Sequence, residues 1–211
     1  MVLFADLNEE DFGQIHTPID DMVFGADDVM YAEGAQALGV FTLRKGMVKL
    51  VRSTADGRER IVRVLRPGDV IGLEALATSH YDSEAVAIIE SSVCRIPLSV
   101  LHHLSANSPR LHMRLMQKWQ QALKDADDWL AELNFGTARQ RVAGLALKMR
   151  DSEAPKFTSF FARDDMGAML DLKLETVSRE ISALVRDGLI RPVDKGGRRY
   201  EILNDQRLMA Q

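Results

Sequence analysis

Cysteine is almost absent from this chain, because Cys94 is the only one among 211 residues. One thiol cannot form an intrachain disulfide, and one thiolate cannot hold an iron–sulfur cluster that needs several cysteines. An unpaired cysteine of this kind often behaves as a small buried hydrophobic residue. We therefore expect Cys94 to lie in a core and not to act as a redox switch.

Long apolar runs are also missing, although 46% of the residues are hydrophobic. No segment is long enough to cross a membrane, and residues 1–6 lack the basic and apolar regions of a signal peptide. We therefore expect a cytoplasmic protein without a membrane partner. The length suffices for one large domain or two modest ones.

The signatures of common enzymes are lacking as well. The sequence has no phosphate-cradling GxGxxG or Walker loop and no Ser-His-Asp arrangement. An enzyme on a cupin-like jelly roll needs clustered His and Glu ligands on neighbouring strands, and no His-x-His pair is present. We expect no catalytic residues, and a cupin-like enzyme is only a distant alternative.

Positive charge is unevenly distributed along the chain, whose formal net charge is −4. Residues 135–211 hold 14 Lys and Arg against 11 Asp and Glu, a net charge of +3. Residues 1–134 hold 13 against 20, a net charge of −7. A nucleic-acid partner is therefore expected at the C-terminal part. Because the excess is modest, specific contacts must add to the electrostatic attraction, and binding should weaken with salt.

The first part of the chain has the pattern of short strands separated by turns. Turn glycines recur at intervals of 11 or 12 residues: Gly34, Gly46, Gly57 and Gly68. Apolar segments of strand length lie between them: Val40–Leu43, Met47–Val51 and Ile61–Leu65. This pattern is typical of a jelly roll. We predict an α+β protein with a β-roll domain over residues 1–107 that begins with a short helix over Leu7–Ile15.

Residues 135–211 have the pattern of a winged helix-turn-helix domain. Thr137 can cap a helix from Ala138 to about Arg150, and Phe157–Phe161 is a candidate strand. A short helix over Asp164–Leu170 is followed by a three-residue turn and a second helix, the spacing of a helix-turn-helix.

One face of that second helix, at about 174–187, carries the chemistry for reading a G·C pair. Glu175, Ser178 and Arg179 fall on the same face. A carboxylate can accept from the cytosine amino group, and a guanidinium can pair with guanine O6 and N7. Apolar residues on the opposite face would anchor the helix: Val177, Ile181 and Leu184. The alternative is a solvated helix face with a Glu–Arg pair.

Two short strands are predicted after this helix. Gly188 is placed to end the helix in the left-handed conformation, and the strands follow at Leu189–Val193 and Arg199–Leu203. The basic glycine turn Asp194–Arg198 joins them. Such a β-wing brings positive charge near phosphates.

A long helix is predicted over residues 108–134. Ser108 can act as N-cap, and Pro109 suits the first helical position. Apolar residues then repeat at spacings of 4-3-4-3-4, as in a coiled-coil seam: Leu115, Trp119, Ala122, Ala126, Trp129 and Leu133. A second apolar line has a strict spacing of seven: Met116, Leu123 and Leu130.

These two apolar lines leave two arrangements open. One line could pack on the chain's own β-roll while the other meets a second subunit, or a monomer could bury both against its own domains. We favour a homodimer with the 4-3-4-3-4 stripe at its interface, because proteins that read DNA half-sites usually dimerise.

The chain resembles the CRP/FNR family of bacterial transcription regulators. Glu175–Arg179 matches the family's recognition-helix motif, and Asp187–Ile190 matches its helix exit. Ser178 makes the match closer to the FNR branch than to the cyclic-AMP receptor branch, which carries glycine there. Pro67–Gly72 resembles the family's β-roll, and Val93–Pro97 the strand that leaves it.

Two residues depart from the family pattern. Asp171 replaces the glycine usual in the turn, but aspartate tolerates the left-handed conformation. Lys173 replaces the usual Ser or Thr at the N-cap, which should weaken the helix start by about 1 kcal/mol. Lys173 either contacts a phosphate or is solvated.

The resemblance implies half-sites near TTGA in double-stranded DNA, and RNA polymerase as a further partner. Arg179 is expected to contact guanine and Glu175 the paired cytosine, while Ser178 and Leu174 contact thymine or its methyl group. The residues expected to hold phosphates are Lys173, Thr176, Arg198 and Arg199.

A cyclic nucleotide is not expected as the effector. Relatives that bind one carry Gly-Glu near a short helix, and an arginine followed by Ser or Thr, which neutralises the phosphate. Gly72–Leu76 only approximates the first element, and residues 81–87 contain no arginine. Glu84 in that stretch would repel a phosphate. A cyclic-nucleotide-responsive regulator stays an alternative.

Other effectors of the family are considered by resemblance alone. FNR-type oxygen sensors use four cysteines for their iron–sulfur cluster, and only Cys94 is present. Haem stays possible by family analogy, although the candidate axial ligands match no haem-attachment motif: His16, His80, His102, His103 and His112. The other interpretation is a cofactor-free regulator controlled by its abundance or by modification.

Overall fold

The computed structural model describes residues 20–211 except 55–56, 58, 134, 152–153 and 195, and it does not describe the side chains of residues 104–107 and 132. The chain forms two compact units, Met1–Asp125 and Ala126–Gln211. The expected helix over Leu7–Ile15, and His16, lie outside the described residues. Across the described part of the chain, no helix combines the length and the apolar character needed to cross a membrane.

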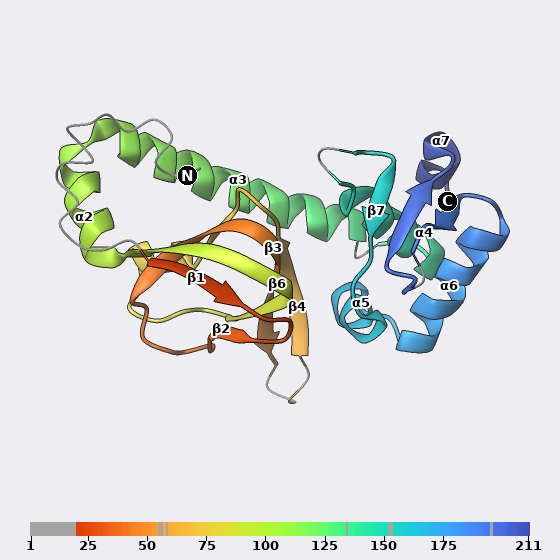
Figure 1. Ribbon diagram of the computed structural model, residues 1–211, viewed down its shortest axis with the longest axis horizontal. Coiled ribbons are helices and arrows are strands. Elements are labelled where there is room, and N and C mark those ends of the chain that lie inside the picture. The colour runs from red at the N-terminus through yellow and green to blue at the C-terminus, as the bar shows by residue number, and fades with distance from the viewer. Residues whose placement is uncertain (1–19, 55–56, 58, 134, 152–153, 195) are drawn as a thin grey trace. The chain divides into compact units, whose positions relative to one another are not determined.

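The first unit contains an antiparallel β-roll, as predicted (Figure 1). Its sheet runs in the order β1-β6-β3-β4, with β2 paired to β6 and β5 paired to β3. The strand bounds are β1 Asp20–Phe24, β2 Val29–Tyr31, β3 Gly39–Ser53, β4 Glu59–Leu65, β5 Val70–Ile71 and β6 Glu84–Pro97. The predicted strands at Ile61–Leu65 and Val93–Pro97 lie inside β4 and β6.

The prediction of two separate strands at Val40–Leu43 and Met47–Val51 is wrong, because both belong to the continuous strand β3. Gly46 does not make a turn. It takes a φ of 98° at an irregularity in the pairing of β3 with β6, and a Cβ there would lie 2.2 Å from the Ser91 Oγ. Glycine therefore lets the two strands approach closely where the register shifts.

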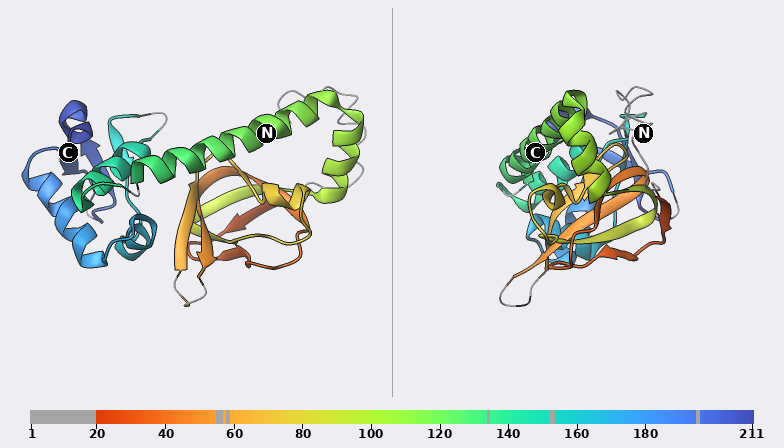
Figure 2. Two further views of the ribbon diagram at one scale, coloured as in Figure 1. Left: turned by 180° about the vertical axis from the view of Figure 1, so that it is seen from behind. Right: turned by 90° about the vertical axis from the view of Figure 1, so that its left-hand side faces the viewer.

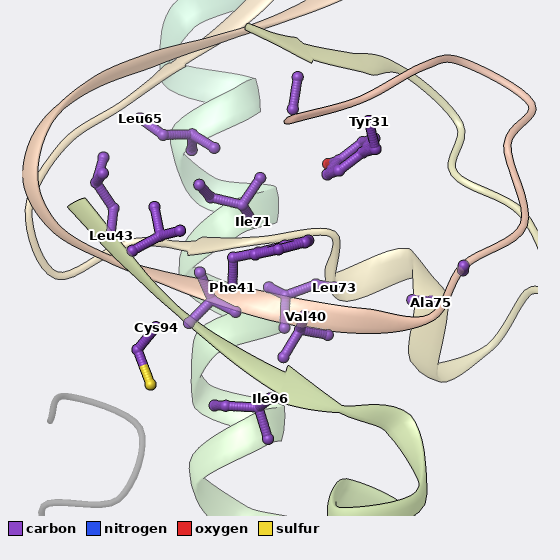
Figure 3. Close-up of a cluster of buried hydrophobic side chains, with 14 of the residues drawn as sticks. Tyr31, Val40, Phe41, Leu43, Leu65, Ile71, Leu73, Ala75, Cys94 and Ile96 are labelled. Atoms are coloured by element: carbon purple, nitrogen blue, oxygen red, sulfur yellow. The ribbon is translucent and has the colours of Figure 1, made fainter. Parts of the chain in front are cut away.

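The core of the roll is a continuous cluster of buried apolar side chains from β2 to β6 and from the segments that follow β5 and β6 (Figure 3). Cys94 on β6 belongs to it and is fully buried. Burial raises the pKa of this thiol, and the nearby Arg44 guanidinium opposes the shift only in part. The expectation that Cys94 lies in a core is therefore confirmed.

Three helical segments lie beside this core: η1 (Leu73–Leu76), α2 (Leu98–Asn107) and α3 (Pro109–Leu133). The start of α3 is as predicted, since the Ser108 hydroxyl accepts from the Leu111 N–H at 3.3 Å. The Lys118 ammonium donates to the Gly68 carbonyl at 2.8 Å, which ties α3 to the turn before β5. Figure 2 shows α2 turning back into α3.

The 4-3-4-3-4 stripe of α3 does not form one free surface. Leu115 is 4% exposed and packs in the core of the roll, and Leu133 is buried in the second unit. These two residues are unavailable to a second subunit, and the half-buried Ala122 packs against the core of the roll as well, which corrects the predicted interface at both ends and at Ala122. The spacing of seven marks the exposed side instead: Met116, Leu123 and Leu130 are all exposed, and so is Met113.

Among its described residues, the second unit contains the end of α3, four complete helices and a three-stranded sheet (Figure 1). The sheet order is β7-β9-β8. The bounds are α4 Ala138–Lys148, β7 Phe157–Ser159, α5 Arg163–Leu170, α6 Leu174–Arg186, β8 Ile190–Pro192, β9 Arg199–Ile202 and α7 Asp205–Met209. Thr137 caps α4 as predicted, in a reciprocal pair with Gln140. Sequence reasoning missed α7, which Asn204 caps.

Gly46→Ala tests the close approach of β3 to β6. Gly34→Ala is the matched control, because Gly34 also has a positive φ but a Cβ there would meet no described atom within 4 Å. We expect Gly34→Ala to lower the free energy of unfolding by about 1–2 kcal/mol, and Gly46→Ala by about 1–3 kcal/mol more, since it adds a steric clash. Urea unfolding measures both. Equal losses would contradict this account of β3.

Candidate nucleic-acid interface

The turn between α5 and α6 is set by a close backbone approach. A Cβ on Gly167 would lie 2.6 Å from the Leu172 carbonyl oxygen, and the Leu172 N–H donates to the Gly167 carbonyl at 3.0 Å. Asp171 takes the left-handed conformation with a φ of 53°. The family's turn therefore survives with aspartate, as predicted, and the glycine that permits it lies within α5.

Helix α6 presents the two sides expected from its sequence. Val177 and Leu184 are fully buried, whereas Glu175 and Arg179 are exposed. The Arg179 side chain is 69% exposed and forms an ion pair with Glu180 at 3.3 Å. The guanidinium is therefore not engaged in the i,i+4 pair with Glu175 that a plain solvated face would suggest.

The remaining predicted contact residues of α6 also lie at or near its surface. Leu174 is 46% exposed, and Thr176 and Ser178 are half-buried. Lys173 is exposed at the N-cap, and its side chain makes no capping hydrogen bond, as predicted. Its backbone carbonyl accepts from the Thr176 N–H at 2.9 Å. The first turn of α6 thus carries exposed apolar, acidic and basic side chains together.

The C-terminal end of α6 is held by a contact that the sequence pattern does not reveal. Gly188 has a φ of 68°, and the Leu189 N–H donates to the Leu184 carbonyl at 3.0 Å, as in a glycine-terminated helix. The Arg139 guanidinium on α4 forms an ion pair with Asp187 at 2.7 Å and donates to Gln211 at 2.5 Å. Arg139 therefore links the end of α6 to α4 and to the chain terminus.

The wing is the hairpin β8–β9, and its turn is ordered by Asp194. The Asp194 carboxylate accepts from the backbone N–H groups of Arg198 at 3.0 Å and Arg199 at 3.1 Å. Both arginines are exposed. The Arg199 guanidinium lies 3.5 Å from Asp151 and 4.7 Å from the centre of the Phe157 ring. The two wing cations therefore differ, since Arg199 is restrained against its own domain. Lys195 lies outside the described residues.

Arg163 ties the wing to the helix-turn-helix. It is the first residue of α5, and its Nη2 donates to the Gly197 carbonyl at 3.0 Å and to the Tyr200 hydroxyl at 3.1 Å. Its guanidinium also lies over the Phe160 ring at 5.6 Å. Sequence reasoning missed this residue, because its partners lie more than thirty positions away.

In the roll, two aromatic rings lie near Glu74. Tyr31 and Tyr81 stack with ring centres 3.7 Å apart, and the Tyr81 hydroxyl donates to the Gly39 carbonyl at 2.7 Å. Burial and the nearby Glu74 carboxylate raise the pKa of Tyr31. Within the described part of the chain, one buried oxygen of Glu74 and the Tyr31 hydroxyl have no hydrogen-bond partner.

The histidines in the described part of the chain are all exposed. His80 is exposed and its Nδ1 lies 2.9 Å from the Ser79 hydroxyl. His102, His103 and His112 are exposed as well. The described residues contain no group of three or more His, Cys, Asp or Glu side chains placed to hold a metal ion.

Comparison with known proteins places both units in one family. Residues 22–108 match the cyclic nucleotide-binding domain and residues 140–211 the Crp-like helix-turn-helix domain. The transcriptional activator protein FnrL of Cereibacter sphaeroides is 32% identical over 170 residues, which cover 76% of this chain and 66% of FnrL. The anaerobic regulatory protein of Pasteurella multocida is 27% identical over 206 residues, which cover 94% of this chain and 74% of that protein.

A solved structure gives the same assignment. FixK2 from Bradyrhizobium japonicum is 29% identical and superposes with a TM-score of 0.82, over 92% of this chain and 97% of FixK2. The exposed face of α6, the wing and these similarities lead to one conclusion. The chain belongs to the CRP/FNR family of DNA-binding transcription regulators, as a distant FNR- and FixK-like homologue that lacks the cysteines of the FNR cluster and is not an enzyme.

Proposed function

We propose that two copies of this chain bind a pseudo-palindromic DNA site, with one α6 helix in the major groove of each half-site. In a dimer of this kind the two recognition helices lie about one helical turn apart, roughly 34 Å. The observation that carries the proposal is the outward face of α6: Glu175 and Arg179 are exposed while the opposite face is buried.

The base contacts follow from the chemistry of that face. Arg179 pairs with guanine O6 and N7, and Glu175 accepts from the amino group of the paired cytosine. Leu174, which is exposed beside them, contacts a thymine methyl group, and Ser178 contacts a neighbouring thymine. The family resemblance makes TTGA the half-site that these residues read.

The phosphate contacts fall on two elements. Lys173 and Thr176 lie at the start of α6, and Arg198 and Arg199 lie on the wing. Arg163 acts as a positioning residue, because it holds the wing turn through the Gly197 carbonyl. These contacts fix the register of the protein on DNA and carry no sequence information themselves.

The dimer forms through the exposed side of α3. Met116, Leu123 and Leu130 repeat at seven residues, the spacing of a coiled-coil position. Trp119 and the half-buried Ala126 and Trp129 flank this line and remain in the proposed interface.

RNA polymerase is the further partner, and promoter geometry decides whether the bound dimer activates or represses. Residues 81–87 contain Glu84 and no arginine, which does not suit a cyclic phosphate.

Arg179→Ala should weaken binding to a TTGA palindrome by about 1–3 kcal/mol and relax the preference at one base pair. Competition gel shifts with every single-base variant of the half-site measure both effects. Glu180→Gln is the control, because it removes the surface ion pair and keeps the guanidinium, so affinity should stay within about twofold. A loss that is uniform over all sequences would contradict the base-reading role.

Arg198→Ala should weaken binding to all sequences alike and reduce the slope of log affinity against log salt by about 1. Arg163→Lys keeps the positive charge, but the lysine cannot reach both the Gly197 carbonyl and the Tyr200 hydroxyl. The amide hydrogens of the wing turn should therefore exchange faster. DNA affinity should fall about as much as in Arg198→Ala, while the slope of log affinity against log salt should stay the same. Loss of affinity in Arg198→Ala at some sequences only would rule out a phosphate contact.

Leu123→Asp should shift the protein from dimer to monomer, because it places a carboxylate in the apolar contact between two α3 helices. We expect the dissociation constant of the dimer to rise by at least about 100-fold, roughly 3 kcal/mol. Sedimentation velocity measures it, and Gln117→Asp, on an exposed polar position of the same helix, is the control. A dimer that survives Leu123→Asp unchanged would refute this interface.

A further inference from the structure

The first unit contains a pocket that the proposed DNA contacts do not use. It lies where η1, α2 and α3 meet and has a volume of about 170 Å³. Its apolar wall consists of Leu76, Leu101, Leu115 and Met116, with Trp119 beside them, and His102 and His112 complete the lining. Carboxylate, ammonium and guanidinium groups are absent from this lining, within the part of the chain that the structure describes.

The walls of this pocket are held apart by fixed elements. Leu101 and Leu115 are anchored in the core of the roll. The end of η1 is closed by a hydrogen bond from the Thr78 hydroxyl to the Glu74 carbonyl at 3.0 Å, and α3 is tied to the roll through Lys118. The buried part of this lining is therefore fixed by the fold of the roll.

The size and lining restrict what can bind. An engineered apolar cavity of about 150 Å³ in another protein stays dry and binds benzene, so this pocket has room for one six-membered aromatic ring with a small substituent. It is too small to enclose a porphyrin or a nucleotide. The imidazoles of His102 and His112 can donate or accept a hydrogen bond, whereas a phosphate would find no guanidinium.

We propose that this pocket binds a small monocyclic aromatic molecule with one hydroxyl group, a phenol-type ligand, and that it is the effector site of the regulator. The ring packs against Trp119 and the leucines, and the hydroxyl bonds to one of the two imidazoles. Met116 and Trp119 belong both to the pocket and to the exposed side of α3. The ligand therefore changes the surface through which, in the proposed function, two copies associate.

Trp119 supplies the reporter, because the chain has only two tryptophans. In the full chain carrying Trp129→Phe, 4-methylphenol should change the Trp119 emission saturably. In the chain without that substitution, it should shift the monomer–dimer constant at least about threefold. Toluene should bind about tenfold more weakly, since it lacks the hydroxyl, and cyclic AMP should not compete. Linear, unsaturable quenching would overturn the proposal, and saturable binding without a shift of the dimer constant would overturn its regulatory part.

Two variants locate the binding site. Leu76→Phe fills the pocket and should weaken 4-methylphenol at least about tenfold, while Leu38→Phe, at an exposed leucine outside it, should not. Replacing both His102 and His112 with leucine should abolish the preference for 4-methylphenol over toluene. Toluene binding should be kept, which shows that the variant is still folded. Unchanged binding in Leu76→Phe would place the ligand elsewhere. DNA binding by α6 is tested by Arg179→Ala, so a failure here leaves that proposal standing.

Discussion

The position of α6 depends on how closely α5 approaches the turn that follows it. With only hydrogen at the Gly167 Cα, the Leu172 carbonyl can come within a distance that any Cβ would block. Val177 and Leu184 can then enter the apolar interior of the domain, and the same rotation of α6 brings Glu175 and Arg179 to its outer side. The chemistry offered to DNA is therefore a consequence of one backbone contact and the burial that it permits.

Local signals in the sequence predicted much of the architecture. Ser108 followed by Pro109, Thr137 before α4 and Gly188 after α6 all mark helix ends in the structure. Each of these signals acts through hydrogen bonds between residues a few positions apart, and so it can be recognised without the fold. Gly46 failed as a turn signal, because its role depends on Ser91 in another strand.

Tertiary contacts determine the features that the sequence did not predict, namely which side of α3 packs on the roll and which residues Arg139 and Arg163 contact. The heptad spacing in α3 correctly identified two apolar lines, but a period does not say which line meets the roll, and Leu115 turned out to belong to the core. Arg139 and Arg163 showed no pattern in the sequence, since the residues that accept these hydrogen bonds lie 34 to 72 positions away. The positions of α6 and the wing therefore depend in part on arginine contacts between residues far apart in the chain, which a periodic sequence pattern cannot reveal.

These arginines also bear on how a domain with a small positive excess would bind DNA in the proposed way. Arg139 and Arg163 are committed to contacts within the domain, whereas Arg179 has one exposed ion pair, of a kind that contributes about 0–1 kcal/mol. In the proposed complex, Arg179 would exchange Glu180 for a guanine edge at little cost. Release of Arg163 from its acceptors would instead free the wing turn from α5. Some arginines thus hold the domain together, while others are available to contact DNA. With few charges available, selectivity would come more from where these side chains are placed than from the total charge.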